Sequence, residues 1–250
     1  MKLSGKTCLI TGGLSGIGAA TAVALAERGA SISIVGRTRD SAALNRIRGQ
    51  VGSLGGKCHF IQADLGSAEG CARTIEETCS VLGPVDVIVH SAGSTSPGSL
   101  LEVTEEQWFN AFDVHVHAVF RLCRMAVPIM KTQGEGAIVL ISSVAGLRGC
   151  LGALSYGVVK GALPQFARAL ARELADDNIR VNCISPGVIR TPFQNYLKPE
   201  QIKNNIQNRI PLHREGQPED VATLIAELVT NEFITGENVV IDGGLSMRVV

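Results

Sequence analysis

Residues 11–18 read TGGLSGIG, directly after a β-rich run at Thr7–Thr11 and directly before an alanine-rich helical pattern. Glycines in such a turn permit tight bending and let a phosphate group approach backbone N–H groups, while the amino terminus of the next helix favours negative charge. A plain surface turn can carry the same glycines. The order of strand, glycine turn, helix and second strand is nevertheless the one that a mononucleotide-binding half requires.

Outside this stretch the chain keeps alternating short β-rich runs with longer helical patterns. Several runs are apolar without alternation, as expected for strands covered on both faces. The pattern predicts a single-domain α/β fold over residues 1–250, a doubly wound, seven-stranded parallel sheet of the Rossmann type. Predicted strands are Thr7–Thr11, Ser31–Val35, Lys57–Gln62, Asp86–His90, Ala137–Ser142, Arg180–Ile184 and Asn238–Ile241, and predicted helices cover 16–29, 39–49, 67–81, 104–132, 153–176 and 218–230. Residues 192–214 break the rhythm and are expected to form a mobile helical flap.

The composition limits the classes of function. Lys+Arg and Asp+Glu both total 23 and the formal net charge is zero, so the chain lacks the basic footprint of a nucleic-acid or membrane-surface binder. The seven cysteines are scattered, with no C-x-x-C pair and no histidines at metal-ligand spacing, and we expect reduced thiols and no metal. The amino terminus has no apolar leader stretch, which favours a cytoplasmic enzyme.

Tyr156 and Lys160 stand four residues apart in a predicted helix, thirteen residues after Ser143. Positions four apart lie on one face of a helix, so a phenol and an ammonium would project into the same space. A nearby positive charge favours the phenolate and makes tyrosine a usable acid or base near neutral pH. By chance alone such a pair occurs on many solvated helices, but with Ser143 it predicts proton transfer to a substrate oxygen.

The end of the second predicted strand carries information on nucleotide choice. An acidic residue there would bind the ribose 2′-hydroxyl of NAD, but residues 34–39 read IVGRTR and no acid occurs before Asp40. A guanidinium such as that of Arg37, next to Thr38, pairs well with a 2′-phosphate. The sequence therefore favours NADP over NAD, although both arginines of this loop would also be normal as solvated charges.

Taken in order, these residues resemble the short-chain dehydrogenase/reductase family over essentially the whole chain. The resemblance rests on the glycine turn, Ser143, Tyr156 and Lys160, and on further short motifs. These are Asp64-Leu65, Ala92-Gly93, Pro186-Gly187 with Thr191, and the run IDGG at 241–244.

The resemblance implies a role for each matched position. Tyr156 would be the general acid of carbonyl reduction, Ser143 would polarise the carbonyl, and Lys160 would also bind the nicotinamide ribose. Asp64 and Leu65 would flank the adenine, although Asp64 is also placed to cap the next helix. The full set implied to bind the cofactor is Gly12, Leu14, Ser15, Gly16, Ile17, Gly18, Arg37, Thr38, Asp64, Leu65, Ser91, Ala92, Gly93, Tyr156, Lys160, Pro186, Gly187, Val188 and Thr191.

Two positions depart from the family pattern. The family has a pair of asparagines before Ala-Gly, where this chain has His90-Ser91, so the side-chain bonds that brace the sheet there must differ. The family's fourth catalytic residue, an asparagine that supports a water chain from the lysine, falls at His115. A histidine there would retain the proton relay in altered form, or serve only in packing, whereas His117 is expected to face elsewhere.

We therefore predict an NADP(H)-dependent oxidoreductase that interconverts a small ketone and a secondary alcohol. Three alternatives are kept: a 3-oxoacyl-[acyl-carrier-protein] reductase, an NAD-dependent alcohol or sugar dehydrogenase, and a non-catalytic nucleotide-sensing regulator. The stretches 132–136 and 176–178, where carrier-protein reductases of the family tend to be basic, contain no lysine or arginine, and Lys131 is the one nearby cation before the strand. Residues 94–99, 147–154 and 193–197 are expected to line the substrate pocket. The resemblance also implies a homo-oligomer, a tetramer or dimer.

Overall fold

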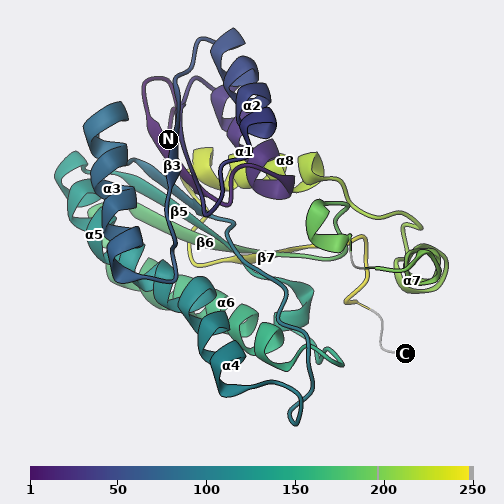
Figure 1. Ribbon diagram of the computed structural model, residues 1–250. Helices are drawn as coiled ribbons and strands as arrows, with labels where there is room; N and C mark the ends of the chain where they lie inside the picture. The colour runs from purple at the N-terminus through teal and green to yellow at the C-terminus, as the bar shows by residue number, and fades with distance from the viewer. Residues whose placement is uncertain (196, 248–250) are drawn as a thin grey trace.

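Seven parallel strands form one sheet in the order β3-β2-β1-β4-β5-β6-β7 in the computed structural model, which describes residues 1–195 and 197–247 (Figure 1). The strands are β1 (Thr7–Thr11), β2 (Ser31–Gly36), β3 (Cys58–Gln62), β4 (Val87–His90), β5 (Gly136–Ile141), β6 (Ile179–Pro186) and β7 (Asn238–Ile241). Every predicted strand is confirmed to within two residues at either end. The sheet order is that of a doubly wound dinucleotide-binding fold extended by one strand.

Helices cover both faces of this sheet (Figure 1). Apolar side chains alternate between the two faces along β1, where Cys8 and Ile10 join the core cluster under α1, α2 and α8, and Leu9 joins the cluster under α3, α5 and α6. Burial on both sides explains why the strands read as continuous apolar runs. The helices are α1 (Gly16–Ala26), α2 (Ser41–Ser53), α3 (Ala68–Leu82), α4 (Glu105–Phe112), α5 (Ala118–Gln133), α6 (Leu154–Leu174), α7 (Pro199–Asn204) and α8 (Pro218–Thr230).

The carboxyl ends of β1, β4, β5 and β6 lie at the same edge of the sheet, because all pairings are parallel. Crossovers on the two sides of the β1–β4 pair run in opposite directions, so the loops after these strands separate and leave a crevice. The loops at this edge contain the glycine turn, residues 91–93, Ser143 and Gly187. Residues far apart in the chain are thereby brought to one place.

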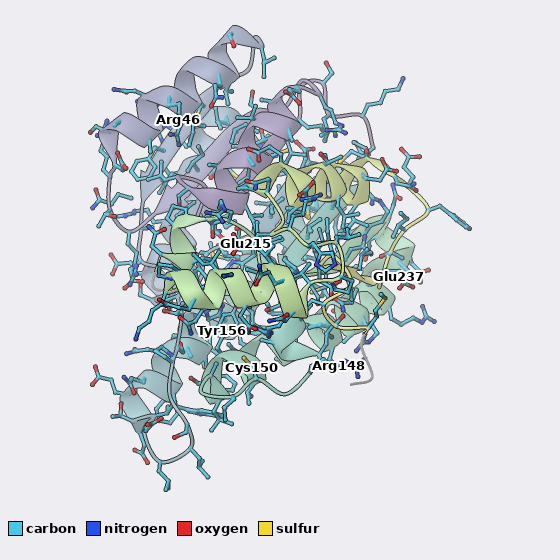
Figure 2. The ribbon with its side chains drawn as sticks, turned by 90° about the vertical axis from the view of Figure 1, so that its right-hand side faces the viewer. Arg46, Arg148, Cys150, Tyr156, Glu215 and Glu237 are labelled. Carbon is cyan, nitrogen blue, oxygen red and sulfur yellow. The ribbon has the colours of Figure 1, made fainter. Side chains whose placement is uncertain are left out.

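The segment between β6 and α8 is helical, as predicted. It contains a 3₁₀ turn at Pro192–Gln194, then α7, and then a π turn at Asn205–Arg209. Backbone bonds from Arg190 N to Gly216 O (2.8 Å) and from Gly216 N to Val188 O (2.9 Å) tie the two ends of this segment together. In Figure 2 the helical ribbon of α7 lies above Tyr156.

The predicted helix over 104–132 is divided in the structure. Its start is as expected, with a capping box in which Thr104 Oγ1 accepts from Gln107 N (3.2 Å) and Gln107 Oε1 accepts from Thr104 N (3.0 Å). A π turn at Asp113–His117 then separates α4 from α5. Such turns insert one residue into the helical ladder and occur frequently at functional sites. The turn includes buried His115 and exposes the carbonyl of Val114 to a partner outside the helix.

His90 braces the sheet where the family has an asparagine. His90 Nε2 donates to Val114 O (3.2 Å), because a carbonyl can only accept. His90 Nδ1 therefore accepts from the Thr11 hydroxyl (3.1 Å), which in turn accepts from Ala92 N (3.0 Å). This order of donors requires a neutral imidazole with its proton on Nε2. Burial, reinforced by the charge of Lys160, lowers the pKa of His90 to about 3 and keeps it neutral.

Within the described ranges, no helix is long and apolar enough to cross a membrane. In the same part of the chain, no three His, Cys, Asp or Glu side chains gather in a way that could hold a metal ion.

Replacing His90 by asparagine is expected to make the fold less sensitive to acid. The pKa of His90 is about 3 in the folded protein against an ordinary value of 6.5, so between these values only the unfolded chain binds the proton. The free energy of unfolding therefore falls as the pH drops below 6.5, by at most about 1.4 kcal/mol per pH unit from this residue. An amide can donate and accept in the same place but does not titrate.

Melting temperatures measured from pH 7 to pH 5 should therefore decline less steeply for His90→Asn than for the wild type. His117→Asn, which removes a half-exposed histidine, is the matched control and should follow the wild type. Parallel declines for His90→Asn and the wild type would contradict this account.

Candidate active site

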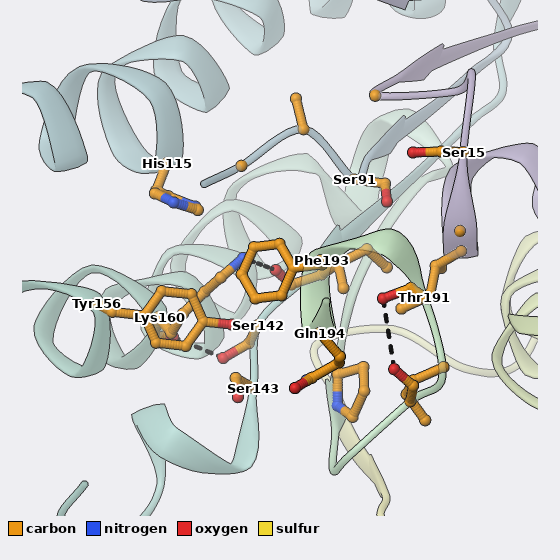
Figure 3. A pocket seen from close by; sticks show the side chains of 18 of the residues that line it. Ser15, Ser91, His115, Ser142, Ser143, Tyr156, Lys160, Thr191, Phe193 and Gln194 are labelled. Carbon is orange, nitrogen blue, oxygen red and sulfur yellow. Dashed lines mark hydrogen bonds between the residues drawn. The ribbon is translucent and has the colours of Figure 1, made fainter. Parts of the chain in front are cut away.

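One cavity of about 210 Å³ at the carboxyl edge of the sheet brings together the predicted catalytic residues (Figure 3). It is lined by Ser143 from the loop after β5, by Tyr156 and Lys160 from α6, and by His115 from the π turn. The remaining lining residues are Gly12, Ser15, Gly16, Ile17, Ser91, Ala92, Gly93, Ile141, Ser142, Pro186, Gly187, Ile189, Thr191, Phe193 and Gln194.

Tyr156 and Lys160 project from the first two turns of α6 on one face, as their spacing predicted. Lys160 Nζ lies 5.7 Å from the centroid of the Tyr156 ring. The lysine is 6% exposed and its Nζ donates to Ile141 O (2.7 Å). Burial lowers the pKa of Lys160 to about 8. At neutral pH the side chain therefore still carries its charge, held close to the phenol ring.

The Ser142-Ser143 pair directly follows β5, and a 3₁₀ turn at Val144–Gly146 lies between it and α6. Ser142 Oγ donates to the Lys160 carbonyl (2.6 Å), while Ser143 Oγ accepts from Ala145 N (3.2 Å). A hydroxyl that accepts from the backbone still has its own proton to donate. Gly146 permits the close approach to α6, since a Cβ there would lie 2.5 Å from Gly161 N. The serine pair and the helix are thus held in one arrangement.

His115 is fully buried and lies edge-on to Tyr156, with ring centroids 6.0 Å apart. Its Nε2 lies 3.3 Å from Ser94 N and 3.2 Å from Ser94 O, and one ring nitrogen can satisfy only one of these groups. Its Nδ1 is the one buried side-chain nitrogen or oxygen among the described residues that has no hydrogen-bond partner. Burial first, and then the charge of Lys160, holds the pKa of His115 well below its usual value.

His117 points away from the cavity, as predicted. It is half-exposed, and its Nδ1 lies 2.9 Å from Asp113 Oδ1. Of the two histidines in the π turn, only His115 belongs to the site.

The loop after β6 forms the wall opposite α6. The Phe193 ring lies 6.1 Å from the Tyr156 ring, and Gln194 lines the same cavity as Ser143 (Figure 3). Of the loops expected to line the pocket, only these two residues do so, because residues 94–99 and 147–154 lie outside the cavity. Residue 196, within the third expected stretch, lies outside the described residues. Sequence reasoning did not single out Ser142, Ile141 or Ile189 as site residues, although the first two end a predicted strand.

The glycine turn forms the other end of the cavity. Gly12 has a φ of +67°, and a Cβ there would lie 2.9 Å from both Cα and N of Ala92. A Cβ at Gly18 would lie 2.4 Å from Gly12 O, so the helix α1 can begin against the turn only without a side chain at this position. Both glycines therefore serve close backbone packing, as the sequence motif predicted.

A neighbouring cavity of about 130 Å³ continues the site toward β2 and β3, and shares Gly12, Ala92 and Gly93 with the first. Arg37, Asp64 and Leu65 line it, as predicted for the adenine end. Asp64 Oδ1 accepts from Gly66 N (3.0 Å), whereas α3 is capped by Ser67, not by Asp64. Among predicted cofactor residues, those outside both cavities are Leu14, Gly18, Thr38 and Val188.

Asp40, the first acidic residue after β2, caps a helix and does not point to the ribose position. Asp40 Oδ1 accepts from Ala42 N and Ala43 N, both at 3.0 Å, and caps the amino terminus of α2. Gly36, at the end of β2, has no side chain. No carboxylate from this loop is thus held at the position where a ribose hydroxyl would be bound.

Comparison with known proteins gives matches over nearly the whole chain. A family model described as enoyl-(acyl carrier protein) reductase matches residues 12–246. The 3-oxoacyl-[acyl-carrier-protein] reductase FabG of Thermotoga maritima is 36% identical over 247 residues, covering 98% of this chain and 99% of the relative.

Two solved structures are closely similar. The L-sorbose reductase from Gluconobacter frateurii, complexed with NADPH and L-sorbose, has a TM-score of 0.91 and 30% identity, covering 100% of this chain and 99% of that one. Acetoin dehydrogenase YohF from Salmonella typhimurium has a TM-score of 0.88 and 31% identity, covering 97% and 96%.

Replacing Gly93 by alanine is expected to destabilise the protein by displacing His115. An alanine Cβ would lie 2.3 Å from His115 Cε1, and overpacking of this kind costs about 1–3 kcal/mol. Urea unfolding of Gly93→Ala should show this loss, and Gly93→Ala/His115→Ala should recover part of it because the obstacle is a side chain. Gly18→Ala meets backbone and should gain nothing from His115→Ala. Full stability of Gly93→Ala, or no recovery in the double variant, would contradict the packing described.

Proposed function

Because this chain belongs to the short-chain dehydrogenase/reductase family, we propose that it is an NADP(H)-dependent oxidoreductase that interconverts a small ketone and a secondary alcohol. The observation that carries this proposal is the meeting of Ser143, Tyr156 and Lys160 in a cavity that continues into a glycine-lined turn. Proton donor, oxygen-binding hydroxyl and nucleotide end are thereby adjacent.

The residues present fit a dinucleotide with a 2′-phosphate. The backbone of Gly12 approaches Ala92 so closely that a side chain would fill the turn, which leaves the N–H groups at the start of α1 accessible to phosphate. Arg37 lines the adenine-end cavity while Asp40 caps α2, and this combination favours NADP over NAD. The similar L-sorbose reductase was solved with NADPH. When bound, the nicotinamide supplies or accepts the hydride.

Tyr156 acts in this mechanism as the general acid of reduction. Its hydroxyl donates a proton to the oxygen of the substrate as negative charge develops there, while Ser143 donates a hydrogen bond to the same oxygen. The Lys160 cation, buried beside the phenol ring, favours the phenolate and so makes the proton easier to release. In alcohol oxidation the same phenolate accepts the proton. General acid catalysis of this kind contributes about 10²- to 10⁴-fold.

We propose that His115 helps to return a proton from solvent to Tyr156 after each reduction. Its Nδ1 has no partner within the described structure and the residue lines the cavity, so the ring has one nitrogen that no protein group occupies. Because the pKa of His115 is well below its usual value, the ring is neutral and relays a proton by accepting at one nitrogen and releasing from the other. The alternative is that His115 only packs against Gly93.

The charge around the site favours a small free substrate over one held on an acidic carrier protein. Lys131, the one cation before β5 where carrier-protein reductases are basic, is paired with Asp177 at 2.8 Å. An acidic carrier protein would therefore meet more like charge than unlike.

A second candidate function is reduction of 3-oxoacyl groups on acyl carrier protein. It is favoured by the name of the Thermotoga maritima relative, which matches this chain over its whole length. A third, nucleotide sensing without catalysis, is opposed by the intact set of Ser143, Tyr156 and Lys160 in one cavity.

We further propose a homo-oligomer, a tetramer or dimer, formed through α4, α5 and α6. Phe109 and Phe120 are 59% and 51% exposed on two of these helices, and Val158 is exposed on the third. Large apolar side chains in this position favour burial against another protomer. Sedimentation of the purified protein measures the number of copies.

Tyr156→Phe is expected to lower turnover by about 10²- to 10⁴-fold while leaving cofactor binding nearly unchanged, because only the hydroxyl is lost. The assay is oxidation of NADPH or NADH with small ketones, hydroxyketones and an acetoacetyl carrier-protein thioester. Higher kcat/KM with the thioester than with every free ketone would replace our proposal by the second candidate function. Cofactor binding with no turnover on any compound would support a sensor, and substantial activity in Tyr156→Phe would exclude Tyr156 as the principal acid.

His115→Phe is expected to lower turnover by about tenfold and to change the pH profile of kcat, because the ring remains but both nitrogens are lost. His115→Asn, which restores a polar group, should lie closer to the wild type. Turnover and a pH profile in His115→Phe equal to those of the wild type would show that His115 only packs.

A further inference from the structure

A third hollow, of about 500 Å³, opens beside the adenine end of the site at the carboxyl ends of β2 and β3. Arg37, Ala63 and Asp64 line both this hollow and the 130 Å³ cavity, so the two are continuous along one stretch of chain. The hollow adds Gln62 and a second guanidinium, that of Arg73. Arg73 lies nine residues beyond Asp64, and no motif of the sequence points to it.

The packing of α3 brings Arg73 to this place. Ser67 Oγ accepts from Gly70 N (2.9 Å) and begins the helix directly after the loop that contains Asp64. A Cβ at Gly70 would lie only 1.9 Å from Asp64 O, so α3 packs on this loop at its first turn through a bare backbone. Arg73 is three residues further along, on the same face of the helix. Its side chain is therefore directed to the loop end of β3.

The backbone at Arg37 is also held. Gln62 Nε2, from the end of β3, donates to Arg37 O at 3.0 Å. This bond joins the β2 loop to β3 across the hollow, and keeps the start of the Arg37 side chain next to Ala63 and Asp64. Two guanidinium groups thus face one hollow from two separate elements.

Neither arginine is neutralised within the described structure. No carboxylate there lies within 4.0 Å of either guanidinium, although Glu69, Glu76 and Glu77 stand at helical spacing from Arg73, and Glu77 is engaged by His59 at 2.7 Å. Asp64 is the one acid on the wall of the hollow, and its Oδ1 is occupied by Gly66 N. Two exposed guanidiniums against one carboxylate leave a surplus of positive charge that a small anion would balance.

We propose that Arg37 and Arg73 together bind a phosphate monoester, the 2′-phosphate of the adenosine ribose, an inference that rests on the proposed use of NADP(H). A phosphate monoester carries about −1.5 to −2 charges at neutral pH and presents three acceptor oxygens. Two planar guanidiniums can each donate two hydrogen bonds to such a group. Arg73 therefore gives the 2′-phosphate site a second cation. The glycine turn contains no lysine or arginine that could take this role.

The test is calorimetric binding of NADPH, NADH, 2′,5′-ADP and 5′-AMP to the wild-type protein and to Arg73→Ala. We expect Arg73→Ala to weaken NADPH and 2′,5′-ADP by about 3- to 10-fold, the effect of losing one typical hydrogen bond, and to leave NADH and 5′-AMP within about twofold. Arg73→Lys, which keeps the charge but not the fork, should lie between the two.

Arg46→Ala serves as the control, because Arg46 is an exposed helical arginine on α2 that lines neither the hollow nor the two cavities of the site. The inference would be overturned if Arg73→Ala bound NADPH as tightly as the wild type does. An equal loss of affinity for NADH and NADPH would also overturn it, because that result would show that Arg73 contacts adenine. If Arg37→Ala loses NADPH selectively while Arg73→Ala does not, the proposed NADP preference stands and the inference about Arg73 fails. Equal binding of NADPH and NADH by the wild type would overturn both.

Discussion

The backbone of Gly12 touches that of Ala92 where β1 and β4 end side by side, and the rest of the site depends on this contact. With a Cβ only 2.9 Å from Ala92, no residue other than glycine fits there. The Thr11 hydroxyl accepts from Ala92 N and links the same two loops to His90 and, through it, to the π turn. The nucleotide end and the helix that contains His115 are therefore positioned by one short network.

Burial decides which titratable side chains around this network are charged and which are neutral. Lys160, His90 and His115 lie together in the interior, and burial lowers the pKa of each. The two histidines remain neutral, so the lysine is the one of the three that is charged at neutral pH. A single buried cation beside a phenol is an arrangement suited to moving a proton. The same burial makes the fold sensitive to acid, since both histidines titrate normally once the chain unfolds.

Patterns in the sequence predicted the strands of the sheet and three of the residues that meet in the main cavity. All seven strands were predicted, several of them from apolar runs that helices cover on both faces. The meeting of Ser143, Tyr156 and Lys160 follows from helical spacing and from the parallel sheet. The roles of these residues in catalysis remain proposals. The π turn could not be foreseen, because residues 104–132 have the composition of an ordinary helix and the extra residue is accommodated by packing. The loops 94–99 and 147–154 do not line the main cavity because they bond to each other, from Gly98 N to Gly152 O (2.8 Å) and from Leu154 N to Gly98 O (3.1 Å), a pairing between distant segments that local sequence does not reveal.

The sequence by itself determined the sheet, the glycine turn and the face of α6 that carries Tyr156 and Lys160, because each depends on local periodicity or on glycine at a tight turn. Only the tertiary structure decided which polar groups have partners. It placed Asp40 on the amino terminus of α2, left His115 Nδ1 unpaired and brought Arg73 to the same hollow as Arg37. Such choices depend on distances between segments distant in the chain, and hydrogen-bond partners are set by those distances.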